Sequence, residues 1–377
     1  MQQRDQAQQA GVHRDHDSHA AYSLYDANVH TGRASESSES SAPDTTDDEA
    51  FRAGRAALLD TLADLLLREL DAPLAERLAA DPFLARALDP PTTAHGLRQL
   101  RADYARLFLI EAPPYAALYR DAAAVIGGES ARQWSDFLHT HQGRLQVAPE
   151  HERLASPDHL GLYLRALAQA ERLGAASLVM REVLSWAPLY LTALEREDPR
   201  GFYGRLAGLV AATLQASARL APSDGAELAG DGGGTVGAAD ASANMQDVVE
   251  AQPDDDLRLI TRMLCIPATS GWFLSKREMR RQAQALGANV GLVTRAQMLE
   301  QVFALSGLDG RTGDLLVGLR ALAEEWQAAC QEWIEAVGSW QDVLAPWRRH
   351  LYATQAILNR LHEQTRTETF GTSSALE

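Results

Sequence analysis

The sequence predicts an all-α protein, and three observations lead to that prediction. Leucine and alanine recur at intervals of three and four residues over most of the chain, as on the apolar face of a helix. Arg and Glu, which favour helices, occupy many positions between them. Alternating runs of Val, Ile and Thr, which would indicate strands, are missing. We expect a helical bundle with a helical C-terminal extension and a disordered N-terminal tail.

Residues 1–50 are a polar, acidic segment with 10 acidic and 3 basic side chains. They contain too few large apolar side chains to offset the entropy lost on ordering, so we predict a disordered tail. His13, His16 and His19 are three residues apart, but a flexible acidic tail offers no fixed ligand geometry. We therefore expect no metal site there.

Residues 51–220 are predicted to form a helical domain. Amphipathic stripes with helical spacing cover residues 58–70, 97–109, 134–145, 160–173, 178–194 and 202–220. The following residues, 221–256, hold 9 acidic and no basic side chains among many small ones, which is typical of a flexible linker. Such a long linker would also allow a homodimer by domain swapping.

Residues 257–377 return to helical spacing, and a long helical region is expected from Asp314 to Gln364. Pro346 should kink it or begin a new helical segment. Four tryptophans lie on one stripe, which we call the tryptophan stripe; it comprises Leu319, Leu322, Trp326, Cys330, Trp333, Val337, Trp340, Leu344, Trp347, Leu351, Thr354, Leu358 and Leu361. We favour packing against the protein's own core, and the alternative is a seam that binds a partner or a second copy.

Charge and cysteine content exclude several classes of protein. The formal charge of -16 resides in the two acidic segments, because the other residues carry 32 charges of each sign. Cys265 and Cys330 have no CxxC partner, so neither a disulfide framework nor a cysteine zinc site is indicated. The N-terminus lacks the order of a secretory signal, and no run of 18 apolar residues occurs. We expect a cytoplasmic protein without stable membrane insertion.

The motifs of the common enzyme classes are missing as well. The chain contains no GxSxG elbow, no HExxH helix, no phosphate-binding loop and no dinucleotide fingerprint after a strand. We therefore expect no catalytic residues, no cofactor and no metal.

The segment from Asp103 to Tyr119 is more specific than its surroundings. It reads Asp-Tyr-Ala-Arg-Leu-Phe, then Glu-Ala-Pro-Pro-Tyr, with a second tyrosine four residues later. Pro113 and Pro114 remove two backbone donors and should end the preceding helix. Tyr115 and Tyr119 should then share one face of the next helix. The segment is either a helical corner with packed tyrosines or a rigid aromatic wall suited to gripping a peptide.

A second segment reads Ser-Pro-Asp-His-Leu-Gly-Leu-Tyr and ends at Tyr163. Ser156 as N-cap, Pro157 at the first helical position and Asp158 in the first turn predict the start of a helix. That pattern does not explain His159, whose protonated form is disfavoured at the positive end of a helix. A neutral imidazole beside an acid and a tyrosine hydroxyl could bind a ligand group, and an ordinary helix start is the alternative.

Together, these two motifs resemble those of the TorD/DmsD family of cytoplasmic redox-enzyme maturation chaperones, in their order and spacing. The segments Trp186–Tyr190 and Phe202-Tyr203 look like the helices that follow in that family. The resemblance is clearest over residues 51–220, and the segment SGWFLSKREMRRQAQALG with the tryptophan-bearing end is similar to the C-terminal region of a longer branch. Where the family commonly has Glu-Leu-Glu-Phe, this chain reads Tyr163-Leu164-Arg165-Ala166.

The resemblance implies a TorD-like helical protein that is not an enzyme. It implies binding of the apo-form of a molybdenum-containing oxidoreductase catalytic subunit through its twin-arginine signal peptide, which delays export until the cofactor is inserted. An arginine pair and an apolar run require an apolar groove with carboxylates near its mouth. The candidate groove residues are Tyr104, Phe108, Pro114, Tyr115, Tyr119, Pro157, Asp158, His159 and Tyr163. Asp103 and Glu111 could supply further charge.

Two other functions stay open at this point. Seven basic and two acidic residues lie between Arg258 and Glu300, and the segment 276–303 could be a helix-turn-helix that reads DNA. Its joint, Gly287–Val293, is longer than the usual turn of that motif, so nucleic acid is not the partner that we favour. The third alternative is an assembly factor in which the tryptophan stripe docks a partner.

Overall fold

The computed structural model describes residues 45–143, 145, 156–221, 253–291, 293–308 and 310–373 of the chain. These residues are almost entirely in helices and loops, and no strand occurs among them, which confirms the predicted all-α fold. The chain divides into two units between Asp44 and Thr45, and every described residue belongs to the second unit. Nearly all of the predicted tail and linker lies outside the described residues, so both stay predictions.

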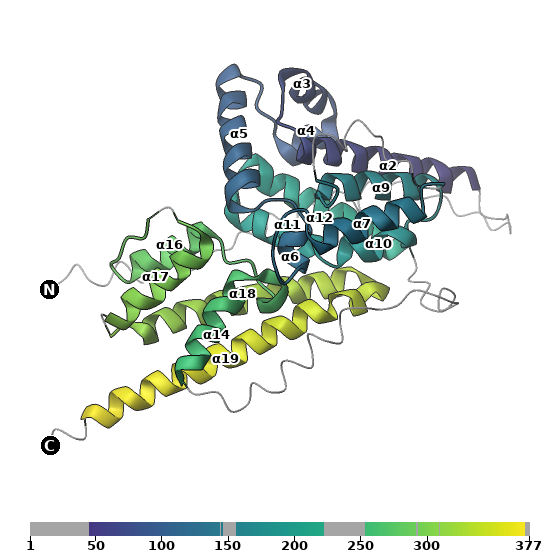
Figure 1. Cartoon of the computed structure of the whole chain (residues 1–377). Coiled ribbons are helices and arrows are strands. Elements are labelled where there is room, and N and C mark those ends of the chain that lie inside the picture. Colours follow the sequence, from purple (N-terminus) through teal and green to yellow (C-terminus); the bar gives the residue numbers. More distant parts are fainter. Residues whose placement is uncertain are drawn as a thin grey trace, which may run out of the picture. The chain divides into compact units, whose positions relative to one another are not determined.

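The first half of the described chain contains most of the helices that the apolar stripes predicted (Figure 1). They are α2 (Thr45–Leu67), α3 (Ala72–Ala80), α4 (Pro82–Leu88), α5 (Ala94–Arg106), the π-helical turn η1 (Leu107–Glu111), α6 (Ala117–Arg120), α7 (Glu129–Thr140), α9 (Leu160–Arg172), α10 (Ser177–Leu184), α11 (Ala187–Glu197) and α12 (Phe202–Leu220). The stripe over residues 178–194 is split into α10 and α11, because Pro188 lies in the first turn of a new helix.

Short polar residues begin several of these helices. Asp71, Asp81 and Thr93 each accept a hydrogen bond from a backbone N–H of the first turn of α3, α4 and α5. A proline in the first turn of α3 and α4 fixes the backbone where no helical donor is needed. These local signals set where the helices start, and packing decides which face is buried.

Helix α9 lies along α2, and ion pairs join the two helices outside their apolar contact (Figure 1). Arg55 donates to Glu171 at 2.7 Å, and both side chains are buried. Arg165 contacts Asp60 and Asp64 on α2. Arg165 stands where the resembling family commonly has an acid, and in this chain it pairs with two carboxylates of α2.

The second half contains α14 (Pro253–Cys265), α15 (Pro267–Ser270), α16 (Lys276–Ala285), α17 (Arg295–Leu308), α18 (Thr312–Ala336), the 3-10 turn η3 (Gly338–Trp340) and α19 (Gln341–Ser373). The region from Asp314 to Gln364 is helical as predicted, but the expectation of one long tryptophan-bearing helix is wrong. The chain turns back at η3, where Gly338 has φ +59°, so α18 and α19 pack against each other. Pro346 lies inside α19 and is not the break.

The tryptophan stripe faces the interior, as we predicted. All thirteen of its residues are buried, including Thr354, whose hydroxyl donates to the Ser270 carbonyl at 2.9 Å. The Trp340 indole donates to the Ala221 carbonyl at 2.8 Å, just after α12. Trp326 lies under the Arg196 guanidinium of α11, at 5.5 Å from its ring centroid. The stripe therefore holds the C-terminal helices onto the first half of the molecule.

Both halves of the described chain lie in one compact unit, because α10, α11 and α12 contact α18, α19 or both. The division into domains at 51–220 and 257–377 stays a prediction. Within the described ranges, every helix is too short or too polar to serve as a membrane span.

Candidate functional site

The two sequence motifs meet in space, although the residues that pair are more than forty positions apart in the chain. Residues 112–117 of the first and 156–160 of the second pair through their backbones, and we call this region the motif corner. Ala116 donates its N–H to the Asp158 carbonyl at 2.9 Å, and Leu160 donates to the Pro114 carbonyl at 2.8 Å. Tyr115 and His159 thus form an isolated antiparallel bridge. The tertiary structure joins the motifs that the sequence presented separately.

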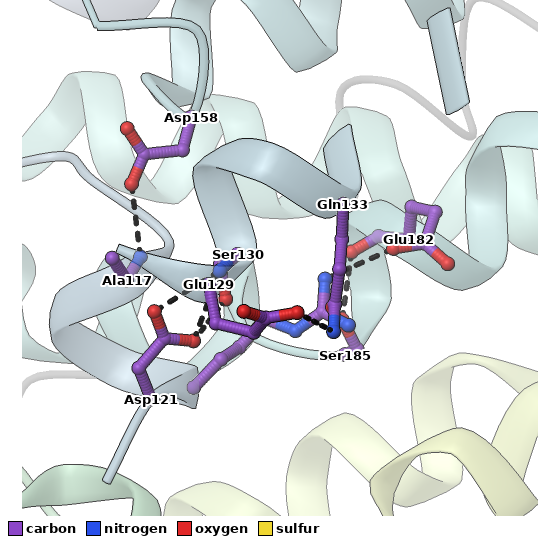
Figure 2. Close-up of polar contacts among 9 residues, drawn as sticks. Ala117, Asp121, Glu129, Ser130, Gln133, Asp158, Glu182 and Ser185 are labelled. Atoms are coloured by element: carbon purple, nitrogen blue, oxygen red, sulfur yellow. Dashed lines mark hydrogen bonds and ion pairs between the residues drawn. The ribbon is translucent and has the colours of Figure 1, made fainter. Parts of the chain in front are cut away.

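Asp158 holds the motif corner together from within. Its carboxylate accepts a hydrogen bond from the Ala117 N–H at 3.0 Å, where α6 begins, and another from the Ser156 hydroxyl at 2.6 Å. The side chain has no exposed surface. Figure 2 shows Asp158 directed at Ala117, at the start of the short helix whose other end is followed by Asp121. Both carboxylate oxygens of Asp158 already have partners inside the protein.

Asp121 has a matching role at the end of α6. Its carboxylate accepts from the Ser130 N–H at 3.0 Å and from the Ser130 hydroxyl, and so connects α6 to the first turn of α7 (Figure 2). Arg120 pairs with Glu182 of α10 at 2.9 Å. Sequence reasoning missed these four residues, because the two partners of each pair are 9 or 62 positions apart.

His159, rather than Ser156, is the N-cap of α9. Its Nδ1 accepts a hydrogen bond from the Gly161 N–H at 3.0 Å, and the helix begins one residue later. An accepting Nδ1 places the ring proton on Nε2 of a neutral imidazole. Burial lowers the pKa of His159 to about 3, which keeps the ring neutral. The prediction of Ser156 as N-cap is wrong, because Ser156 binds Asp158 instead, whereas the expected neutral histidine is confirmed.

Tyr115 and Tyr119 do not share a face of one helix, which corrects the prediction from their spacing. Tyr115 precedes α6 and lies edge-on to the His159 ring, with centroids 5.2 Å apart. Tyr119, on α6, is buried against Trp186, Tyr190 and Phe273. The reason is that the helix after the prolines starts only at Ala117. Tyr115 therefore lies in non-helical backbone and Tyr119 in the helix, so helical spacing does not relate their side chains.

The helical segment before the prolines ends at Glu111, as predicted, but its last turn is π-helical. Helix α5 ends at Arg106 and continues as the π-helical turn η1, in which the Ala112 N–H donates to the Leu107 carbonyl at 2.7 Å. Tyr104 and Phe108 lie on this segment and contact each other edge-on, at 4.5 Å between centroids. The Tyr104 hydroxyl donates to the Leu66 carbonyl at 3.2 Å.

The environment of the tyrosines suppresses their ionisation. Burial raises the pKa of Tyr104 to about 12, with a contribution from neighbouring Tyr115. Burial and the Asp158 carboxylate raise the pKa of Tyr115. Burial raises the pKa of Tyr163, whose ring stacks on Trp134 at 3.8 Å. These hydroxyls stay protonated and can donate hydrogen bonds over the physiological pH range.

The nine residues predicted to line a groove differ in how accessible their side chains are to a partner. Pro157 is exposed, and Tyr104 and Tyr115 are half-buried. The other six are buried; they are Phe108, Pro114, Tyr119, Asp158, His159 and Tyr163. Five of the nine lie in the motif corner, and the other four lie on the helical elements next to it in the chain: Tyr104 on α5, Phe108 on η1, Tyr119 on α6 and Tyr163 on α9. Their contact with a partner stays a prediction.

The helix-turn-helix alternative rests on α16 and α17, and its basic residues are partly used inside the protein. Arg277 donates to the Glu197 carbonyl at 2.7 Å, and Arg295 lies over the Phe273 ring at 4.3 Å from the centroid.

In the described part of the chain, no group of three His, Cys, Asp or Glu side chains could hold a metal ion. The histidines of the tail lie outside that part.

Known proteins are similar to this chain over the segment that contains both motifs. Residues 48–189 match a protein family described as nitrate reductase delta subunit. The chain is 33% identical to a chaperone protein TorD of Psychrobacter over 144 residues, which is 32% of this chain and 63% of that protein. It is 28% identical to a chaperone protein TorD of Shewanella strain ANA-3 over 193 residues, 43% of this chain and 90% of the relative.

A third relative carries a different name. The probable Tat proofreading chaperone DmsD of Haemophilus influenzae is 33% identical over 128 residues, 32% of this chain and 61% of that protein. The chain therefore spans less than two thirds of two of these three relatives. No solved structure matches it, and none of the comparisons supports the DNA-binding alternative. The resemblance to the TorD/DmsD family that the two motifs predicted is thereby confirmed over the segment that contains them.

Proposed function

We propose that this protein is a cytoplasmic molecular chaperone for the maturation of a molybdenum-cofactor oxidoreductase. It binds the apo-subunit and its twin-arginine signal peptide before export and catalyses no reaction of its own. The observation that carries the proposal is the motif corner, where the two segments shared with the TorD/DmsD family pair through their backbones. The names of the relatives, which are chaperones and a proofreading chaperone, support a binding protein rather than an enzyme.

The chemistry of the motif corner suits a peptide ligand. Tyr104 and Tyr115 present half-buried rings that can contact an apolar run. The protonated Tyr115 hydroxyl can also donate to a peptide backbone, whereas the Tyr104 hydroxyl already donates to the Leu66 carbonyl. Pro157 is exposed just before Asp158 and His159, the second of which pairs with Tyr115, and it stiffens the entry to α9. We assign direct contact with the client to these three residues.

Asp158 and His159 contribute in a different way. Because both Asp158 oxygens bind protein donors and His159 caps α9, we assign them a positioning role. They fix the loop that carries Tyr115 against the start of α9. Four of the candidate residues are buried and support that loop from the interior of the protein: Phe108, Pro114, Tyr119 and Tyr163.

The test uses a molybdoenzyme catalytic subunit from the same host, prepared without cofactor and with its leader uncleaved. We expect it to form a stable complex with the full-length protein, and the subunit without its leader to bind more weakly. Absence of a complex with either form would overturn the proposed function. Sedimentation at several protein concentrations tests the additional proposal of a homodimer, in which two copies swap domains through the linker of residues 221–256.

A further inference from the structure

Helix α6 is the element through which the second half of the chain reaches the motif corner. It has four residues, Ala117–Arg120, and a helix of that length is not stable without tertiary contacts. Asp158 holds its start, and Asp121 connects its end to α7. From the second half, α15 lies against α6. The position of α6 therefore depends on both halves of the molecule.

Tyr119 is the side chain of α6 through which this contact is made. Three rings surround it, with centroid distances of 6.1 Å to Trp186, 5.6 Å to Tyr190 and 5.3 Å to Phe273. Trp186 and Tyr190 belong to the first half, whereas Phe273 follows α15 in the second. Among the described residues, no other aromatic ring of the second half pairs with the ring of a candidate residue. Phe273 thus links the second half to the candidate site.

The surroundings of Phe273 fix its position. Phe273 is 2% exposed and lies in the non-helical stretch between α15 and α16. Gly271, at the start of that stretch, has φ +74° and approaches α19 so closely that a Cβ would lie 2.6 Å from the Leu351 nitrogen. The packing of this stretch against α19 therefore determines where the Phe273 ring meets Tyr119.

Arg295, the first residue of α17, contacts the same ring. Its guanidinium lies 4.3 Å from the Phe273 centroid, a distance at which a cation and an aromatic ring attract each other. Its Nε and Nη2 are buried without a hydrogen-bond partner, so the ring supplies part of the stabilisation that these donors lack. Burial raises the pKa of Tyr119 and the Arg295 charge lowers it, which places the guanidinium near the Tyr119 hydroxyl as well. The three side chains form one group that spans the two halves.

We propose that Phe273 and Arg295 are positioning residues for the motif-corner surface to which we assign the client, although both lie outside the segment 48–189 that matches the family. They hold Tyr119 and thereby α6, whose start is bonded to the motif corner. A shift of α6 would release the loop that carries Tyr115. The inference rests on the proposed function and deepens it, because it makes affinity for the client depend on the second half of the chain.

The first measurement is hydrogen exchange of the Ala117 amide, followed by NMR in the full-length protein. Phe273→Leu removes the ring but keeps an apolar side chain. Phe303→Leu is the matched control, because Phe303 is also buried in the second half, on α17. Relative to the amides of α12, which report opening of the whole molecule, exchange at Ala117 should be roughly tenfold faster in Phe273→Leu. Phe303→Leu should affect both sets of amides alike.

The second measurement is calorimetric binding of the client subunit, prepared without cofactor and with its leader. Phe273→Leu should weaken binding about tenfold, which is within the usual range of coupling between distant sites. Phe303→Leu should leave the affinity unchanged. Arg295→Gln should weaken binding about threefold, because a neutral amide lacks the attraction between a cation and a ring. Arg295→Lys keeps the positive charge and should bind the subunit nearly as well as the wild-type protein.

Support for the inference requires both results. If the wild-type protein binds the subunit and Phe273→Leu binds it equally well, the inference is overturned while the proposed function stands. If the two phenylalanine variants lose affinity and stability in proportion, or if Ala117 exchanges no faster than the α12 amides, Phe273 is only a core residue and the inference is again overturned. If the wild-type protein does not bind the subunit, the proposed function fails, and the assignment of a client surface fails with it.

Discussion

The motif corner and the tryptophan stripe both bury aromatic side chains, but they do so by different means. The stripe consists of two packed helices whose inward positions repeat every three or four residues, and all thirteen residues of it are buried. The motif corner consists of two loops joined by backbone hydrogen bonds and by the Asp158 carboxylate. Periodic helices bury a whole face at once, whereas the loops leave half-buried and exposed residues at their edge, such as Tyr115 and Pro157.

This difference suggests a division of roles. The tryptophan stripe stabilises the molecule, because its side chains contact α11 and the end of α12 and offer nothing to a partner. The motif corner instead holds buried polar groups and exposes Pro157 at its edge, and such features are typical of binding sites. Substitutions in the two regions should separate these roles.

Trp326→Ala is expected to have the largest effect on stability. Trp326 is fully buried, and its truncation removes a large apolar side chain from a packed helical interface. The free energy of unfolding should fall by about 3–5 kcal/mol, as measured by denaturant titration. Trp326→Phe, a smaller change, is the control if the alanine variant does not fold. A folded variant that loses affinity for the leader would contradict the division of roles.

Asp158→Ala should have the next largest effect, at the motif corner. The Ala117 N–H would be left buried without an acceptor, which costs roughly 1–3 kcal/mol of unfolding free energy. Affinity for an arginine-pair leader should fall as well, because the loop that carries Tyr115 loses its fixed position. Asp158→Asn keeps an oxygen that can accept from Ala117 and should retain most of the stability. Lost affinity without lost stability would instead favour direct contact between Asp158 and the leader.

His159 makes the stability of the motif corner depend on pH. The folded pKa of about 3 lies below the ordinary value of 6.5, so the unfolded chain binds a proton that the folded chain does not. Stability from this group is intact above pH 6.5 and is lost as the pH falls toward 3, by at most about 1.4 kcal/mol per pH unit. His159→Asn, which keeps an acceptor at the N-cap, should show a weaker decrease in unfolding free energy between pH 6.5 and pH 4. An identical slope in both proteins would exclude His159 as the source.

Arg165→Gln should have a smaller effect on the α2–α9 pair. Arg165 contacts Asp60 and Asp64, and all three side chains are partly exposed, so solvent screens their attraction. We expect a loss of about 0.5–1 kcal/mol in unfolding free energy, reduced further in high salt. Gln327→Ala on α18 is the control. It removes a hydrogen bond between two neutral side chains, Gln327 and Gln355, so its effect on the unfolding free energy should not depend on salt. A salt-independent loss for Arg165→Gln would contradict the electrostatic reason.

Removal of residues 1–44 should have the smallest effect. The polar composition of that segment predicts that it adds little burial, so the melting temperature of residues 45–377 should be unchanged. A large decrease, measured by scanning calorimetry, would show that the segment packs on the rest of the chain. A longer deletion would enter α2, which begins at Thr45.

Much of the candidate site could be predicted from the sequence, but its internal contacts could not. The motifs around Tyr115 and His159 stand out by composition and order, and the neutral histidine follows from its place at a helix start. The N-cap role of His159 and the bond from Ser156 to Asp158 could not be predicted. A serine, an aspartate and a histidine in succession can each cap a helix, and only the docking of Ala117 on Asp158 selects among them.

The sequence by itself determined the helical class, the buried face of the tryptophan stripe and the positions of the two motifs, because these follow from local periodicity and backbone chemistry. Only the tertiary structure decided that the chain reverses at η3, that Tyr115 pairs with His159, and that Leu109 and Ile110 face solvent. Those features depend on contacts between distant segments or on a π-helical bond. The alternatives at each position are too close in energy for the neighbouring residues alone to choose between them.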